Sequence, residues 1–311
     1  MAIINVGRYS NLNTSYAKET SANLKSTFSH VLKSIITSRS FFILILSLFL
    51  LLLGSESQLQ FVIGNSLFFL GLVTIGIPHG AVDHLLESGH WVSPSTPRFI
   101  IVYLAYSFAM ALFWYLSPKL ALCLFLFYSA WHFGQSDGEQ WGLNNMIAYL
   151  WGCFVIFYLL GTHFNETNSI LKSISGVTMP FSSPIWLIIP FFFVAVYMRS
   201  YSFAITVLWL MVSSQLPLML AFGLYFIGQH SLSNWKNISK TLNMAHHKIW
   251  IYSSPFHLGA WLVLALFFFV WPMLHISSDY NRWGIFFIFI ACMSLPHVIS
   301  VHLFKKKAET A

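Results

Sequence analysis

The sequence predicts an all-α protein, a polytopic bundle of transmembrane helices, and two observations carry this prediction. The 311 residues are 57% hydrophobic and 18% aromatic but only 8% charged, so most side chains could not be solvated on the surface of a soluble protein. Apolar runs of the length that a helix needs to cross a bilayer, about 20 residues, recur with no long polar gap between them. We therefore expect one polytopic membrane domain.

Polar segments bracket this domain. Residues 1–37 are rich in Ser, Asn and Thr and predict a poorly ordered tail, residues 38–304 predict the single transmembrane domain, and residues 305–311 predict a basic cytoplasmic tail. The first apolar run ends without the small-residue pattern of a cleavage site, so we expect no cleaved signal peptide.

Each apolar run predicts one helix. These helices are expected at residues 38–54, 59–77, 97–117, 119–134, 145–162, 181–199, 250–272 and 284–304. Residues 201–230 could form one tilted helix or two helices broken near Ser213-Ser214-Gln215-Leu216-Pro217, where proline removes a helix donor and clashes with the preceding turn.

The basic residues favour two helices over residues 201–230. Lys and Arg gather in short cytoplasmic loops, and this chain has them before the first run and at Lys305-Lys306-Lys307 after the last. Both termini are then cytoplasmic, which requires an even number of spans. Two helices give about 10 spans and also place Lys236, Lys240 and Lys248 inside, with eight spans as the fallback. The formal charge of +7 is thus explained by basic residues on the cytoplasmic side of the cell (inner) membrane, and it does not indicate nucleic acid binding.

Four histidine motifs stand at or near the ends of apolar runs. They are Ile77-Pro78-His79-Gly80-Ala81-Val82-Asp83-His84, Trp131-His132-Phe133-Gly134-Gln135-Ser136-Asp137, Gln229-His230-Ser231 and Pro296-His297. With ten spans all four reach the same level, in the cytoplasmic half of the membrane. A histidine in a membrane segment is costly unless it is paired, bonded or solvated. A single one has a bland explanation as an interfacial or hydrogen-bonded imidazole, but four at one level favour a metal centre held by His79, His132, His230 and His297.

The neighbouring polar residues have weaker assignments. Asp83 follows His79 by four residues, so on a continuous helix it could accept the spare N–H of that imidazole and fix its orientation. His84 lies on a different helical face and is the weaker candidate ligand. Asp137 is expected either to be a solvated loop charge or to support a ligand in the same way. Six histidines expected in or beside loops receive no role: His90, His163, His246, His247, His257 and His275.

These residues carry a resemblance to a known family. Pro78-His79-Gly80-Ala81-Val82-Asp83-His84, His132-Phe133-Gly134, Gln229-His230-Ser231 with Trp235, and Pro296-His297 resemble the Brp/Blh family of membrane-embedded bacterial and archaeal β-carotene 15,15'-dioxygenases. The resemblance covers roughly residues 40 to 304. It implies cleavage of the central double bond of β-carotene by dioxygen into two retinal molecules, often for a microbial rhodopsin, at a non-haem Fe(2+) held by histidines.

One residue departs from the family pattern. Many members place a further histidine four residues after the one that matches His230, where this chain has Asn234. An amide oxygen is a poorer iron ligand than an imidazole. Either His297 or His84 completes the set, or three histidines bind, or the site has drifted, and we rank His297 first.

Other functions remain open from the sequence. The aromatic runs Phe191-Phe192-Phe193, Phe267-Phe268-Phe269 and Phe286-Phe287-Ile288-Phe289 could line a tunnel for an apolar substrate such as a different carotenoid. A metal or proton transporter could use intramembrane histidines, although no internal repeat supports it. A rhodopsin is disfavoured because no apolar run carries a central lysine for a retinal Schiff base. From the residues alone, iron, copper, zinc and nickel all suit imidazole.

Overall fold

The computed structural model describes residues 29, 32–54, 58–88, 96–274 and 282–310, and the regular elements among them are all helices. The predicted all-α class is confirmed. The predicted tail over residues 1–37 lies mostly outside the described residues. The longer helices are α2 (Arg39–Leu52), α3 (Gln58–Gly71), α6 (Thr96–Leu116), α7 (Pro118–Trp141), α8 (Asn145–Thr162), α9 (Phe164–Ser175), α10 (Ile189–Tyr197), α11 (Tyr201–Ser213), α13 (Leu232–Thr241), α14 (His246–Leu274) and α15 (Arg282–Thr310). Between them lie η1 (Leu72–Gly76), α4 (Ile77–Gly80), α5 (Asp83–Ser88), η2 (Ile185–Ile188), α12 (Leu218–Gly223) and η3 (Leu224–Ser231).

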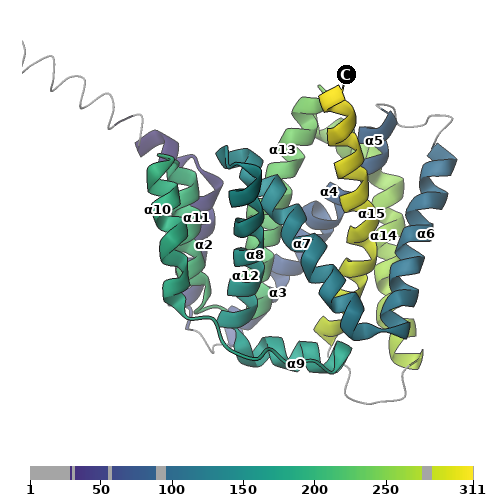
Figure 1. The fold of residues 1–311 in the computed structure, drawn as a ribbon, viewed down its shortest axis with the longest axis horizontal. Coiled ribbons are helices and arrows are strands. Elements are labelled where there is room, and N and C mark those ends of the chain that lie inside the picture. The colour runs from purple at the N-terminus through teal and green to yellow at the C-terminus, as the bar shows by residue number, and fades with distance from the viewer. Residues whose placement is uncertain (1–28, 30–31, 55–57, 89–95, 275–281, 311) are drawn as a thin grey trace, which may run out of the picture.

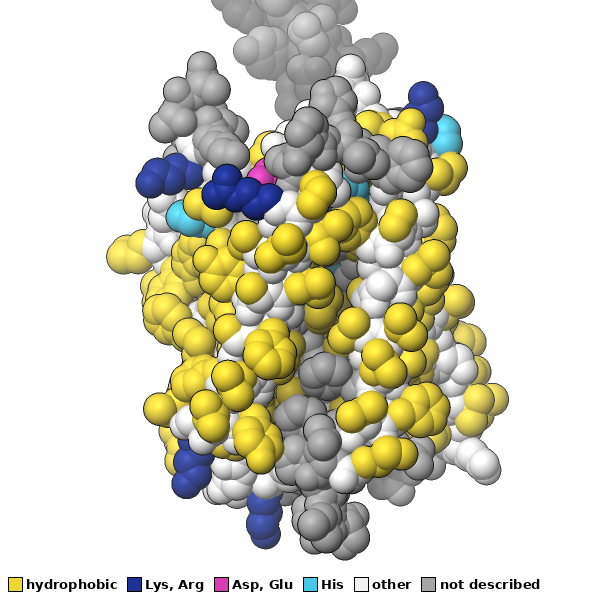
Figure 2. Space-filling view, turned by 90° about the vertical axis from the view of Figure 1, so that its right-hand side faces the viewer, with side chains coloured by type: hydrophobic (Ala, Val, Ile, Leu, Met, Phe, Trp, Pro, Cys, Tyr) yellow, Lys and Arg dark blue, Asp and Glu magenta, His cyan; other side chains and the backbone are white. Residues whose placement is uncertain are grey.

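Most of these helices stand side by side, and α9 lies across one end of the bundle (Figure 1). Five helical stretches in the described part of the chain are long and apolar enough to cross a membrane: Gln58–Ser88, Thr96–Leu116, Asn145–Thr162, His246–Val270 and Trp283–Phe304. Three shorter apolar helices accompany them, at Arg39–Leu52, Ile185–Tyr197 and Tyr201–Ser213. The outer face over α6 and α14 is covered with hydrophobic side chains, and the visible basic groups lie toward its two ends (Figure 2). This surface suits lipid rather than water.

The predicted break before Pro217 is confirmed, since α11 ends at Ser213 and α12 begins at Leu218. The predicted end of the helix near residue 134 is wrong, because α7 continues to Trp141. There Gly142 adopts the left-handed conformation, with φ of +69°, that glycine permits after a helix. The motif containing His132 therefore lies inside a helix and not at its end.

Glycine brings α7 and α8 into close contact. A Cβ atom added at Gly134 would overlap the carbonyl oxygen of Ala148, and one at Gly152 would overlap that of Ala130. Small residues spaced in this way let two helix backbones approach closely, which is how helices pack where no hydrophobic effect drives them together. This contact fixes the face of α7 that carries His132.

Two chain segments depart from α-helix beside the histidine motifs. η1 and η3 are π-helical, and they follow α3 and α12 directly. They pack against each other, and a Cβ atom built on Gly76 of η1, or on Gly71 just before it, would meet the side chain of Ile227 in η3. π-helical turns are rare and are found frequently at functional sites.

Candidate metal centre

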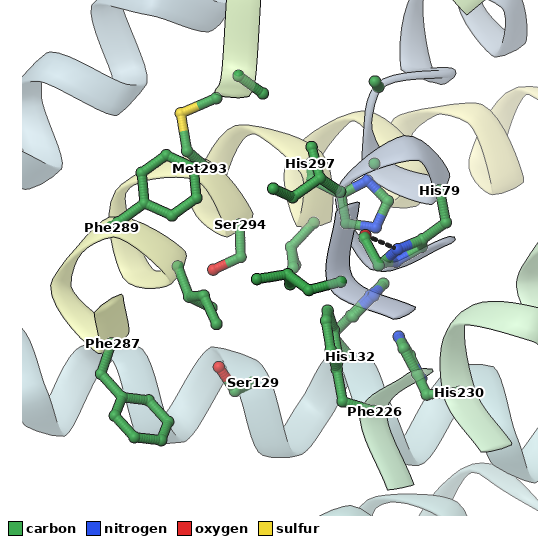
Figure 3. Close-up of a pocket in the computed structure, with 18 of the residues that line it drawn as sticks. His79, Ser129, His132, Phe226, His230, Phe287, Phe289, Met293, Ser294 and His297 are labelled. Carbon is green, nitrogen blue, oxygen red and sulfur yellow. Dashed lines mark hydrogen bonds between the residues drawn. The ribbon is translucent and has the colours of Figure 1, made fainter. Parts of the chain in front are cut away.

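The four histidines predicted as metal ligands lie together. His79 comes from α4, His132 from α7, His230 from η3 and His297 from α15, and all four are buried. The centroids of neighbouring rings are 5.1 Å apart for His79 and His297, 5.0 Å for His297 and His132, 5.0 Å for His132 and His230, and 5.6 Å for His230 and His79. The rings thus form a closed circuit. Figure 3 shows them gathered at one side of a pocket.

Hydrogen bonds orient two of these rings. His79 Nδ1 lies 2.5 Å from the carbonyl oxygen of Gly76, and His297 Nδ1 lies 2.9 and 3.0 Å from the two carboxylate oxygens of Asp83. Each Nδ1 must donate its N–H to these acceptors, so the lone pair stands on Nε2. Both Nε2 atoms are buried and have no hydrogen-bond partner among the described residues. Buried polar atoms are nearly always satisfied, so this pair needs an explanation.

A second carboxylate supports the third ring. His230 Nδ1 lies 3.3 Å from a carboxylate oxygen of Asp137, and the hydroxyl of Tyr225 donates to the other oxygen of Asp137. Trp151 Nε1 in turn donates to the hydroxyl of Tyr225 over 3.1 Å. Asp137, Tyr225 and Trp151 are all buried. The expectation of a solvated loop charge at Asp137 was therefore wrong, because α7 carries this residue into the interior.

The pairing of Asp83 also differs from the expected one. The helix stops at Gly80 and restarts at Asp83, so His79 and Asp83 do not share one continuous helical face. Asp83 instead reaches His297, which is 214 residues further along the chain. A carboxylate that holds the N–H of an imidazole fixes its tautomer and raises its basicity, as is usual behind metal-binding histidines.

Asn234 lies beside Nε2 of His230. Its side-chain nitrogen is 3.2 Å from His230 Nε2, and its oxygen accepts a hydrogen bond of 2.5 Å from Ser136. These contacts give the amide a fixed place at the edge of the cluster. They also leave His230 Nε2 as an acceptor, in agreement with an N–H on Nδ1.

His84 does not join the four rings. It stacks on Phe256, with ring centroids 4.0 Å apart, and its Nδ1 lies 3.2 Å from the carbonyl oxygen of Ala81. The expectation that His257 lies in or beside a loop was wrong, because this residue is buried within α14, where its Nε2 contacts the hydroxyl of Ser253 at 2.6 Å. His163 does lie at the turn between α8 and α9, as expected, and it is buried there. His90 and His275 lie outside the described residues.

The donor chemistry of the cluster fits a metal ion. Rings that bind one ion through metal–nitrogen bonds of about 2.1 Å have neighbouring centroids roughly 4.5–5.6 Å apart, and all four distances fall in this range. No group of three or more His, Cys, Asp or Glu side chains in the described part of the chain is already placed to hold an ion. The rings would therefore have to turn toward a common point.

The cluster borders a cavity of about 440 Å³ whose walls are almost entirely apolar. Among the side chains that the structure describes, only the last of the aromatic runs expected to line a tunnel contributes, through Phe287 and Phe289. Phe191 and Phe268 are partly buried and pack against the core, and Phe193 and Phe269 are exposed on the outside. The other aromatic lining residues come from separate helices: Phe99, Tyr103, Phe125, Phe133, Phe222, Tyr225, Phe226 and Phe256. Sequence runs did not reveal them because single helical positions face the cavity.

The fold and the site together define a class: helical membrane proteins with a carboxylate-supported histidine cluster beside an apolar cavity. The chain belongs to the beta-carotene 15,15'-dioxygenase family, whose model matches residues 70–305 and thus all four histidines. The resemblance seen in the sequence is confirmed. Membership supports an enzyme of the carotene dioxygenase type. Comparisons with curated proteins and with solved structures found no match.

Proposed function

We propose that this protein cleaves the central 15,15' double bond of β-carotene with dioxygen and releases two molecules of retinal. Atoms balance in this reaction, since one C40 hydrocarbon and one dioxygen give two C20 aldehydes. The observation that carries the proposal is the circuit of four imidazoles at the wall of an apolar cavity, in a chain of this family.

The ligands we propose for the ion are His79, His132, His230 and His297. A ferrous ion held there would supply the activation of dioxygen toward a polyene double bond. Its charge would also be matched, because Asp83 and Asp137 place two carboxylates behind the rings and an ion of charge +2 balances them. Asn234 and His84 are then not ligands. Asn234 borders the site, and His84 packs on α14.

The chain's own residues position the hydrocarbon and exclude water. The cavity wall that a polyene would contact consists mostly of apolar side chains and aromatic rings. Ser129 and Ser294, which Figure 3 labels, are rare polar groups on that wall. Phe226 and Phe133 pack against His230, with ring centroids 6.2 and 4.2 Å away. These contacts hold the imidazole from the side of the cavity. An apolar, dry wall strengthens the electrostatic interactions of the rings with their carboxylates.

We propose ten membrane crossings with both termini in the cytoplasm. The apolar stretches and short apolar helices supply eight of these, and α7 and the α12–η3–α13 segment supply the other two. The three short apolar helices can still cross, since a hydrophobic stretch shorter than the bilayer is accommodated by local thinning. This topology puts the histidine cluster toward the cytoplasmic side of the inner membrane. A microbial rhodopsin is the proposed recipient of the retinal.

Expression in cells that make β-carotene tests the proposal directly. We expect retinal to appear by chromatography as the carotene disappears, and neither change to occur with His79→Ala or His132→Ala. His302→Ala is a matched control, because this exposed histidine meets the ring of Trp131 edge-on, with centroids 5.1 Å apart, and does not line the cavity. Carotene left intact by folded protein would sink the proposal and favour another carotenoid. Uptake of metal without any cleavage would favour the transporter.

A further inference from the structure

Beyond the histidine cluster, the residues that line the cavity fall into two groups with different surroundings, and the space beside each group is called an arm of the cavity. The first arm is lined by α6 and α14, and the second by α7, α8 and α12. The first arm is lined by Phe99, Ile100, Tyr103, Leu104, Pro255, Phe256, Gly259, Ala260 and Val263. The second is lined by Phe125, Leu126, Ser129, Val155, Ile156, Leu159, Leu160, Leu218 and Phe222.

The first arm is open to the outside of the bundle. Leu104 is 54% exposed and Ile100 is 38% exposed, although both line the cavity. Gly259 is also exposed, and a Cβ atom built on it would meet nothing within 4 Å. Figure 2 faces this side and shows a furrow between two columns of hydrophobic side chains. The cavity therefore reaches the surface where lipid would contact the protein.

The walls of this furrow are α6 and α14, and both helices pack against α15. α6 and α14 come together near one end, where the rings of Phe99 and Phe256 are 6.4 Å apart. Farther along, each helix packs against α15, and the hydroxyl of Tyr103 donates to the carbonyl oxygen of Met293 on that helix over 3.1 Å. The floor of the furrow is thus the same helix that carries His297. A molecule lying in the furrow would reach the cluster along α15.

The second arm is closed. Phe125, Ser129, Val155, Leu159 and Leu218 are buried, and its other lining residues are only partly exposed. The tight contact of α7 with α8 seals one wall. A long molecule can therefore pass the cluster from the furrow but meets a dead end beyond it.

We propose that the furrow between α6 and α14 is the portal by which an extended hydrocarbon polyene leaves the bilayer and threads end-first past the histidines, and that Gly259 and Leu104 determine what passes. The inference rests on the proposed function for the identity of the polyene. Its support is the exposure of the lining on one arm, the closure of the other and the absence of a side chain at Gly259. The closed arm then sets how far the polyene advances, and so which double bond stops at the cluster.

Obstruction of the portal from either wall tests the inference. Gly259→Trp and Leu104→Trp place an indole in the mouth from opposite helices, so the misfolding of one variant leaves the other as a test. Leu258→Trp and Ile101→Trp are matched controls, because these residues are 60% and 68% exposed, adjoin the portal residues and do not line the cavity. Each full-length protein would be made without oxygen in carotene-producing cells, purified, and assayed for bound β-carotene and bound iron.

We expect both portal variants to carry roughly tenfold less β-carotene than the wild type, with unchanged iron, and both controls to match the wild type. Wild-type levels of carotene in both portal variants would overturn the inference, as would equal losses in the controls. Admission of air then separates the two proposals. If the wild type holds carotene through the portal but forms no retinal, the portal stands and the proposed chemistry fails. A wild type that holds no β-carotene overturns the portal, and the formation of retinal in the carotene-producing cells still decides the proposed chemistry.

Discussion

Asp83→Asn isolates what a buried carboxylate does for the proposed metal centre. Asp83 is 1% exposed and accepts the N–H of His297 Nδ1 at 2.9 and 3.0 Å. Asparagine has nearly the same shape and keeps one oxygen as an acceptor. The substitution removes the negative charge and turns one acceptor into a donor, so the imidazole keeps its tautomer but loses basicity.

The expected effect follows from the strengths of the two hydrogen bonds. A hydrogen bond to a charged group contributes about 1.5–3 kcal/mol, against about 0.5–1.5 kcal/mol for a neutral one. The difference of roughly 1–1.5 kcal/mol corresponds to about a tenfold loss of affinity for the ion. This lies at the lower end of the 10 to 100-fold range typical of residues that hold metal-binding histidines. We therefore expect Asp83→Asn to keep some metal and to lose much of the cleavage activity.

Anaerobic titration of the purified protein with Fe(2+), in competition with a chelator, measures this affinity. Glu87→Gln is the matched control, because Glu87 lies on the same short helix as Asp83 and is exposed. It removes the same charge without touching an imidazole. Wild-type affinity in Asp83→Asn, or an equal loss in Glu87→Gln, would refute the role assigned to the carboxylate.

Three further predictions follow from contacts elsewhere in the bundle. Tyr225→Phe removes the donor to Asp137 and should weaken iron binding roughly 10 to 100-fold in the same titration, since the carboxylate loses its fixed position. His84→Ala should retain wild-type iron content by elemental analysis, because its ring stacks outside the circuit of four; loss of iron would instead make it a ligand. Gly152→Leu should lower stability by about 1–3 kcal/mol in thermal unfolding, because it crowds the α7–α8 contact, whereas Leu150→Ala at an exposed position of α8 should cost much less.

The positions of most helices, and the choice of the four histidines as a candidate cluster, could be predicted because both can be recognised from short stretches of sequence. Length and hydrophobicity suffice to recognise a membrane helix, and Pro217 marks a break by its own chemistry. A histidine at the edge of an apolar run is unusual enough to draw attention by itself. That His297 lies beside His79 followed from placing the helices at one level, and the structure brings these rings to 5.1 Å.

The partners of the histidines could not be predicted in this way. Asp83 was assigned to His79 by helical spacing, but the interruption after Gly80 turns the carboxylate toward His297. Asp137 reads as a loop charge until α7 is seen to extend to Trp141. Tyr225 and Trp151 look like two more aromatics in an aromatic-rich chain, and only their contacts with each other and with Asp137 distinguish them. Such pairings depend on tertiary packing across more than 70 residues of sequence.

Asparagine at position 234 is compatible with the proposed metal centre of four histidines. The four histidines come from four separate elements, and three of them are oriented through Nδ1 by an acceptor of their own. A set of this kind does not depend on a fifth residue one turn after His230. Asn234 is also held away from a ligand role, because Ser136 occupies its oxygen and its nitrogen is turned toward His230. A histidine at 234 would compete for the space of that amide, whereas His297 reaches the cluster from α15 with Asp83 already behind it. The arrangement therefore supports a centre in which α15 supplies the fourth imidazole.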